Sequence, residues 1–242
     1  MALRLLASLL ALGALAAGNG SLQDPAPAPA PAPLATERLL HGFRVLVRPG
    51  FAESPLFDRT IAELDHQLYQ IERALGDDVL AALRRIPIWV GDEAEIHRTK
   101  CMFYHPSAEW LRANEPGREF LARGVEIANA KNFLSWTRDQ PWMVLHELAH
   151  AYHHQVLGHD HEGIEAAFAA AKDSKAYQKT LHFAGREIRH YALTNAKEWF
   201  AEATEAYFGT NDFHPFVRAE LRQVDAGGHA ELVRIWGEPR RG

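Results

Sequence analysis

Two histidines and a glutamate stand in the spacing H-E-x-x-H at His146, Glu147 and His150. Apolar residues recur around them at intervals of three and four, which predicts a helix with one buried stripe. That stripe consists of Trp142, Leu145, Ala149, Tyr152 and Val156. Because residues four apart share a helix face, the imidazoles of His146 and His150 can converge on one metal ion. Glu147 projects about 100° round the helix from His146, so its carboxylate stands beside that ion as a base rather than as a ligand.

A third ligand is needed, because a hydrolytic zinc site takes three protein ligands and keeps a fourth position for water. His153 and His154 follow closely, but ligands at residues 146, 150 and 153 of one helix would span about 10 Å of rise, too far for bonds near 2 Å. We expect these two histidines in supporting or surface positions. The metzincin pattern requires Gly at position 153 and His at position 156, and the chain has His153 and Val156. That class of zinc peptidase is excluded.

Two carboxylates downstream can complete the site. Glu198 and Glu202 are four apart on a helix predicted to start at Thr194 or Asn195, so both face one way. Two acids on one helix face repel each other unless a cation lies there. We therefore expect Glu198 as the third zinc ligand and Glu202 as the acceptor of the outer N–H of a zinc-bound histidine. A solvated acidic face is the alternative, and the bulky Trp199 in the same helix argues against it.

The run Y-x-x-x-N-x-x-E-W-F-A-E that begins at Tyr191, together with the H-E-x-x-H motif, resembles the catalytic domain of anthrax toxin lethal factor and its relatives. This gluzincin-type family of zinc metallopeptidases includes secreted proline-proline endopeptidases. The resemblance covers about residues 139–208 and implies one zinc ion per chain, held by His146, His150 and Glu198. It also implies a zincin-like metallopeptidase domain, Glu147 as general base and Tyr191 as the hydroxyl that assists at the metal.

These assignments predict a secreted zinc-dependent metalloendopeptidase that hydrolyses bonds in a protein or peptide substrate. Zinc would polarise the scissile carbonyl and acidify the attacking water, and Glu147 would pass the water proton to the leaving amine. A secreted zinc-binding or adhesion module without catalysis is the alternative from a different class. Glu147 favours the enzyme, because metal capture gains nothing from an unliganded acid within the motif. An amidase, or an enzyme that processes its own Pro-Ala segment, also remains open.

Substrate contacts are expected just upstream of the motif helix. Residues 124–128 (GVEIA) form a candidate strand at the place where related zinc peptidases pair an edge strand with an extended substrate. Asn129 follows directly and is a candidate contact to the substrate backbone, although a turn or a helix cap suits an Asn here equally well. The one cysteine, Cys101, could block the zinc as a switch ligand, but a buried cysteine is more often a packing residue.

The elements that must position these residues divide into strand signals first and helix signals later. Residues 41–48 and 86–90 are further candidate strands, and residues 56–75 carry a helical stripe that ends at Gly76. From residue 139 onward helical patterns dominate, over residues 140–157, 161–172, 196–208, 216–224 and 230–236. This order predicts an α+β fold, with a small mixed β-sheet followed by a mostly helical lobe and the active-site helix between them.

The ends and the composition of the chain limit its partners and compartment. Residues 1–18 have the layout of a secretory signal peptide, with an uncleaved anchor or a core helix as the alternative. Residues 19–36 are expected to form a Pro/Ala-rich linker, and residues 37–242 one domain, which the resemblance implies to be a zinc metallopeptidase domain. We therefore expect a secreted or periplasmic monomer with no membrane span in the mature chain. The formal net charge of -5 argues against a nucleic-acid partner, and 1 Cys beside 14 His leaves histidines and carboxylates as the ligands of any metal.

Overall fold

The computed structural model describes residues 35–240 of the 242-residue chain. The signal peptide expected over residues 1–18 lies outside the described residues, as does most of the linker expected over residues 19–36. Thr36, the last residue of that linker, already begins a strand. Within residues 35–240, no helix combines the length and the hydropathy that crossing a membrane requires.

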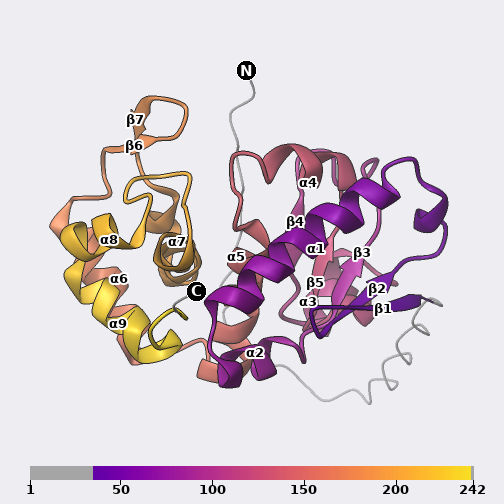
Figure 1. Cartoon of the computed structure of the whole chain (residues 1–242), viewed down its shortest axis with the longest axis horizontal. Helices are drawn as coiled ribbons and strands as arrows, with labels where there is room; N and C mark the ends of the chain where they lie inside the picture. The colour runs from indigo at the N-terminus through magenta and orange to yellow at the C-terminus, as the bar shows by residue number, and fades with distance from the viewer. Residues whose placement is uncertain (1–34, 241–242) are drawn as a thin grey trace, which may run out of the picture.

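Five short strands form one mixed sheet in the order β1-β2-β3-β5-β4 (Figure 1). The inner pairs, β2 with β3 and β3 with β5, are parallel, whereas β1 and β4 pair antiparallel at the two edges. The strands are β1 (Thr36–Leu40), β2 (Phe43–Val47), β3 (Ile88–Val90), β4 (Met102–Tyr104) and β5 (Val125–Ile127). Alternate residues of the inner strands, including Val45, Ile88 and Val125, are fully buried and form one wall of the core.

Three of these strands lie where the sequence predicts them, at residues 41–48, 86–90 and 124–128. β1 and β4 have no counterpart among the predicted strands; β4 has only three residues, too few for an alternating pattern to stand out. β5 is not the edge strand that we expected, because it lies inside the sheet between β3 and β4. The edge that contacts the motif helix is β4, so the prediction for residues 124–128 is wrong in this respect.

Three helices pack in the same core as the sheet and lead to the motif helix. α1 crosses the sheet in Figure 1 and buries Leu64, Leu68 and Ile71, the stripe that the sequence predicts over residues 56–75. α1 contacts α4, and both α1 and α2 contact α5. The three helices are α1 (Phe57–Ala74), α2 (Asp77–Leu83) and α4 (Ala130–Trp136), and the motif helix is α5 (Met143–Tyr152).

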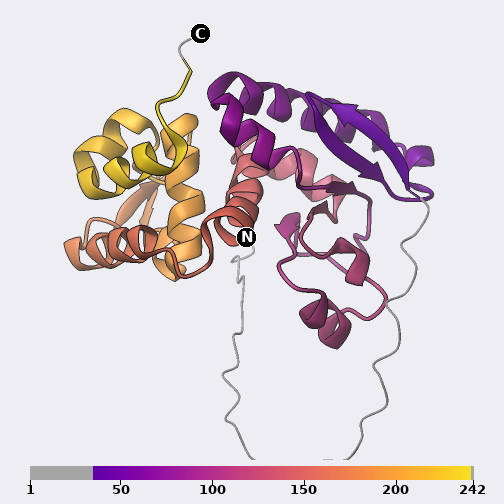
Figure 2. The ribbon, with the colours of Figure 1, turned by 90° about the horizontal axis from the view of Figure 1, so that it is seen from below.

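α5 lies between the half of the molecule that holds the sheet and the half that is mostly helical (Figure 2). It contacts β4 and β5 on one side and α7 (Ala196–Phe208) on the other. A π-helical turn, His153–Leu157, continues α5 with a different register. Val156 is consequently 50% exposed, so the predicted buried stripe ends at Tyr152 instead of including Val156.

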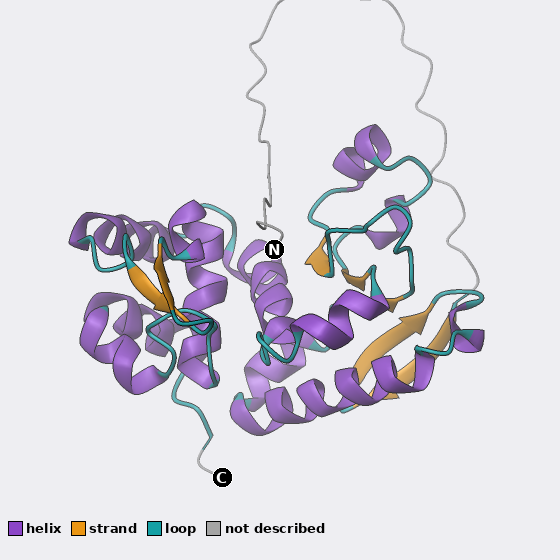
Figure 3. Cartoon of the chain, turned by 90° about the horizontal axis from the view of Figure 1, so that it is seen from above, coloured by secondary structure: helices purple, strands orange, loops and turns teal. Residues whose placement is uncertain are grey.

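The second half of the chain consists mainly of helices, with one small antiparallel hairpin among its described residues (Figure 3). Trp199, Phe200 and Tyr207 of α7 are fully buried, so this helix is the centre of the lobe. The elements around it are α6 (Glu162–Ser174), the hairpin of β6 (Thr180–His182) and β7 (Arg186–Ile188), α8 (Arg218–Val224) and α9 (Ala226–Trp236). The fold is thus α+β, a mixed sheet followed by a mostly helical lobe, which confirms the predicted class.

A buried ion network holds the segment around α3 (Ala108–Asn114) against the sheet face opposite the main core. Glu126 of β5 is fully buried, and Arg118 donates a hydrogen bond to it at 2.5 Å and pairs with Glu93 at 2.6 Å. Burial opposes the ionisation of Glu126, but a hydrogen bond with His105 and the charge of Arg118 lower the pKa of its carboxyl overall. The carboxylate of Glu126 is therefore charged, and the positive charge of Arg118 compensates for the burial of this negative charge.

Candidate metal centre

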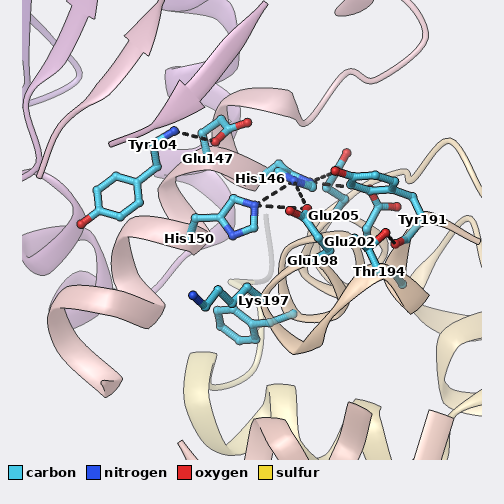
Figure 4. A network of polar contacts seen from close by, with 12 residues as sticks. Tyr104, His146, Glu147, His150, Tyr191, Thr194, Lys197, Glu198, Glu202 and Glu205 are labelled. Atoms are coloured by element: carbon cyan, nitrogen blue, oxygen red, sulfur yellow. Dashed lines mark hydrogen bonds and ion pairs between the residues drawn. The ribbon is translucent and has the colours of Figure 1, made fainter. Parts of the chain in front are cut away.

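Two helices bring the expected metal ligands together. α5 carries His146 and His150 one turn apart, and α7 carries Glu198 in its first turn. The two Nε2 atoms of His146 and His150 are 3.1 Å apart, and Oε2 of Glu198 is 3.4 Å from each of them (Figure 4). The three side chains are 13%, 15% and 14% exposed, so one side of the cluster is open to solvent.

The spacing and the chemistry of these donors fit a zinc ion. Bonds of 2.0–2.2 Å in a tetrahedral site separate neighbouring ligand atoms by about 3.3–3.5 Å. The two 3.4 Å separations lie within this range, and the 3.1 Å between the two Nε2 atoms is slightly shorter. Two imidazoles with one carboxylate are also a ligand set that catalytic zinc sites use. Three protein donors leave one position of a four-coordinate ion for water.

The charges of the cluster also favour a cation. Burial disfavours the protonated ring of His146, yet hydrogen bonds with Glu198 and Glu205 raise the pKa of His146 well above its ordinary value. Burial likewise disfavours an ionised Glu198, but His150 and His146 hold the pKa of that carboxyl well below its usual range. The carboxylates around His146 therefore stabilise a positive charge on that side chain.

Local capping sets the position of the ligand on α7. The Asn195 side chain accepts hydrogen bonds from the backbone N–H groups of Lys197 and Glu198, at 2.9 and 3.0 Å. Asn195 is thus the N-cap, one of the two residues predicted for that role, and α7 begins at Ala196. This cap fixes the first turn of α7, and with it the direction of the Glu198 side chain toward α5.

Glu147 lies on the side of the cluster that faces the sheet (Figure 4). Its Oε2 accepts a hydrogen bond from the backbone N–H of Tyr104, the last residue of β4, at 2.9 Å. Burial raises the pKa of Glu147, and the nearby charges of His150 and His146 oppose that rise only in part. The carboxylate is accordingly more basic than an ordinary glutamate while it remains beside the candidate metal ligands.

Tyr191 begins the 3₁₀ turn Tyr191–Thr194 that leads into α7. Burial and the negative charges of Glu198, Glu202 and Glu147 raise the pKa of the Tyr191 phenol. These three carboxylates belong to the cluster and its surroundings, so Tyr191 lies close to the candidate metal centre. Its hydroxyl keeps its proton near neutral pH and can act as a hydrogen-bond donor.

The carboxylate that contacts the outer nitrogen of a candidate ligand is not the one that we expected. Nδ1 of His146 is 2.7 Å from Oε1 of Glu205 and 3.8 Å from Oε1 of Glu202. Glu202 instead accepts a hydrogen bond from Nδ2 of Asn211 at 3.0 Å. Glu205 is three residues beyond Glu202 on the same face of α7, because helical residues three apart are neighbours. Glu205 could have been considered from the sequence, since Glu198, Glu202 and Glu205 share one face of the predicted helix.

Asn129 does not face a substrate site. It is the N-cap of α4, accepts a hydrogen bond from the backbone N–H of Asn132, and donates to the carbonyl oxygen of His97. Its side chain is buried and engaged within the chain, so the helix-cap alternative is correct and the substrate contact is not. Cys101 is buried and packs against Met143, its sulfur 3.3 Å from the thioether, which is the packing role rather than that of a metal switch.

The two histidines after the motif differ from each other. His153 is 1% exposed and packs against Phe200, so it is not on the surface, and its ring nitrogens have no hydrogen-bond partner among the described residues. His154 instead joins the π-helical turn to the sheet edge, because its Nδ1 is 2.7 Å from the hydroxyl of Tyr104. Tyr104 could not be identified from the sequence, because β4 itself is not recognisable from its three residues.

Comparison of the chain with known protein families, with curated proteins and with solved structures finds no match. The functional assignment of the cluster therefore depends on its donor types, its distances and its burial. These features describe three side chains that could hold one metal ion, with a further carboxylate near them.

Proposed function

We propose that the protein is a secreted zinc-dependent metalloendopeptidase. The observation that supports this most strongly is the spacing of the three donor atoms on His146, His150 and Glu198, with a separate carboxylate, that of Glu147, near them. A structural zinc site is closed by four protein ligands, whereas this cluster offers three and is partly exposed. The resemblance of the motifs to lethal-factor-type peptidases agrees with the proposal.

His146, His150 and Glu198 would hold the zinc ion, which supplies polarisation of the scissile carbonyl and acidification of water when it is bound. Glu147 takes a proton from the attacking water and delivers it to the leaving amine nitrogen. Its burial makes this step easier, since a carboxylate with a raised pKa is a stronger base. Tyr191 donates the hydrogen bond of its phenol to the oxygen on which negative charge develops.

The peptide substrate would lie along β4. Among the described residues β4 pairs with only one strand, β5, and an extended main chain could pair with its other edge. The N–H of Tyr104 on this outer edge already points at Glu147. A substrate strand at this edge would therefore run past the base and the metal ligands. This role replaces the one that the sequence suggested for residues 124–128.

The proposal is tested by metal analysis of the purified protein together with peptide-library cleavage, with and without a chelator. We expect one zinc ion per chain, cleavage that the chelator abolishes, and recovery when zinc is returned. The His150→Ala variant should lose both the zinc and the cleavage. Undiminished cleavage by protein freed of metal would refute the proposal, whereas zinc binding without any cleavage would favour the non-catalytic zinc-binding module.

A further inference from the structure

His146 uses its two ring nitrogens in opposite directions. Nε2 faces Nε2 of His150 and Oε2 of Glu198, and Nδ1 points into a buried acidic region of α7 (Figure 4). Two carboxylates lie in that region, Glu205 at 2.7 Å and Glu202 at 3.8 Å from Nδ1. Only the shorter of these distances is a hydrogen bond.

We propose that Glu205 is the positioning residue that prepares His146 for metal binding, by accepting the Nδ1–H hydrogen bond and so directing the free Nε2 lone pair at the metal position. The inference rests on the proposed metal centre and adds to it the group that orients its first ligand. A neutral imidazole carries one proton, and the partner of one nitrogen decides which nitrogen remains free. With the proton held on Nδ1 by Glu205, Nε2 is the nitrogen that can bind.

Glu205 is buried, and its surroundings leave the hydrogen bond with His146 as its main polar contact. Glu205 is 1% exposed, and His146 is the one side chain among the described residues that hydrogen-bonds with its carboxylate. Its second oxygen, Oε2, is buried without a partner in the described part of the chain. A buried carboxylate with so few partners is costly unless it serves a specific contact. Among the described residues, the hydrogen bond with Nδ1 of His146 is the specific contact that accounts for this buried carboxylate.

Glu202 is occupied elsewhere. Its Oε2 accepts from Nδ2 of Asn211 at 3.0 Å, and the same amide group also donates to the Glu202 backbone oxygen at 2.7 Å. This double contact ties Glu202 to the loop after α7 and holds it away from Nδ1 of His146. The sequence spacing predicts that Glu202 accepts the hydrogen bond from the outer nitrogen of His146. In the structure this acceptor is Glu205, three residues further along α7.

The group formed by His146, Glu202 and Glu205 is not an independent second metal site. Neighbouring ligands of one tetrahedral ion lie about 3.3–3.5 Å apart, and the 2.7 Å between Nδ1 and Glu205 is too short for that arrangement. It has the length of a hydrogen bond with a charged acceptor. Nδ1 of His146 is accordingly a donor to Glu205 rather than a ligand.

The test compares zinc affinity, by competition with a chromophoric chelator, between the wild-type protein and two matched variants. We expect Glu205→Gln to weaken zinc binding about 10- to 100-fold, the usual effect of losing a carboxylate behind a metal-bound histidine. Glu202→Gln should weaken it by less than about 3-fold, because Glu202 makes no hydrogen bond to the ligand. Unchanged affinity in Glu205→Gln, or a larger loss in Glu202→Gln, overturns the inference.

A second measurement needs no variant. Long-range proton–nitrogen correlation spectra of the zinc-loaded wild-type protein should show the His146 proton on Nδ1, exchanging with water far more slowly than the ring proton of the exposed His66. A proton on Nδ1 that exchanges as fast as that of His66 contradicts the contact with Glu205. This measurement tests the inference on the wild-type protein even if Glu205→Gln does not fold.

Peptide cleavage separates this inference from the proposed function. If the wild-type protein binds zinc and Glu205→Gln lowers the affinity, but neither cleaves peptides, then the peptidase proposal fails and the role of Glu205 stands. If the wild-type protein cleaves peptides and Glu205→Gln retains its full zinc affinity, the peptidase proposal stands and this inference fails. Absence of zinc binding in the wild-type protein refutes both.

Discussion

The carboxylate of Glu147 and the backbone N–H of Tyr104 form a hydrogen bond of 2.9 Å. This contact ties the candidate base on α5 to the last residue of the edge strand β4. Oε2 is the acceptor, so Oε1 is the oxygen left for a water molecule at the metal position. The same strand whose outer edge suits a peptide main chain therefore orients the group that would activate water, which couples substrate position to the base.

Tyr191 is expected to act in the transition state rather than in metal binding. The Tyr191→Phe variant should retain its zinc and show a KM close to that of the wild-type protein. Its kcat should fall about 100-fold, because one hydrogen bond to a developing oxyanion contributes about 3 kcal/mol. Steady-state kinetics with zinc analysis of the same samples measures both quantities. An unchanged kcat would remove Tyr191 from the reaction, and lost zinc would show that it supports the metal site instead.

His153 should make the metal-free protein less stable in acid. Burial, with smaller contributions from the charges of His159 and His150, lowers the pKa of His153 to about 3. In the unfolded chain the ring returns to its ordinary pKa of about 6.5, so between these two values the unfolded state binds a proton that the folded state does not. The contribution of His153 is therefore complete above about pH 6.5 and is lost as the pH falls toward 3.

Urea unfolding of the metal-free wild-type protein and of His153→Leu, at pH 7.5 and at pH 4.5, measures this effect. The wild-type protein should lose about 2 kcal/mol more between the two conditions than the variant does. His66→Leu, which removes an exposed histidine, should keep the wild-type dependence on pH. Equal losses in the wild-type protein and in His153→Leu would show that His153 does not stay neutral in the fold.

Arg118 should be needed for the stability of the sheet half. Arg118→Met leaves Glu126 with a buried negative charge that His105 and the 3.5 Å contact with Arg48 compensate only in part. We expect a loss of about 3 kcal/mol in the free energy of unfolding, typical of breaking one side of a buried ion pair. Denaturant titration measures this loss.

An exposed ion pair serves as the control for Arg118. Arg44 and Glu37 pair at 3.0 Å while both side chains are about half exposed. Arg44→Gln should leave the free energy of unfolding nearly unchanged, because solvent screens an exposed pair. Equal losses in Arg44→Gln and Arg118→Met would show that the burial of Glu126 carries no extra cost.

The sequence was informative where a periodic pattern carried the residues. The intervals of three and four around His146 and in α1 predict those helices, and a capping side chain at Thr194 or Asn195 predicts the start of α7. Such helical residues keep their spacing in three dimensions, so the expected ligands on α5 and α7 could be chosen from sequence alone. Chain order, strands before helices, likewise predicted the α+β class.

The strand β4 and the contact of Glu205 with His146 depend on tertiary packing, which a local sequence pattern does not reveal. β4 is three residues long, and its place at the sheet edge follows from its pairing with β5 and its contact with α5. The choice between Glu202 and Glu205 is similar, because both lie on the correct face of α7. The packing of α7 against α5 and the contacts of Glu202 with Asn211 decide which one reaches Nδ1 of His146.

The most direct test of the central claim compares the zinc-loaded wild-type protein with zinc-loaded Glu147→Gln on one peptide library, with the new termini counted by mass spectrometry. Glu147 is not one of the three candidate ligands, so both proteins should contain one zinc ion per chain. We predict that the wild-type protein generates new peptide termini and that Glu147→Gln is slower by at least about 100-fold, the usual range for loss of a general base. Equal cleavage by the two zinc-loaded proteins would contradict the account.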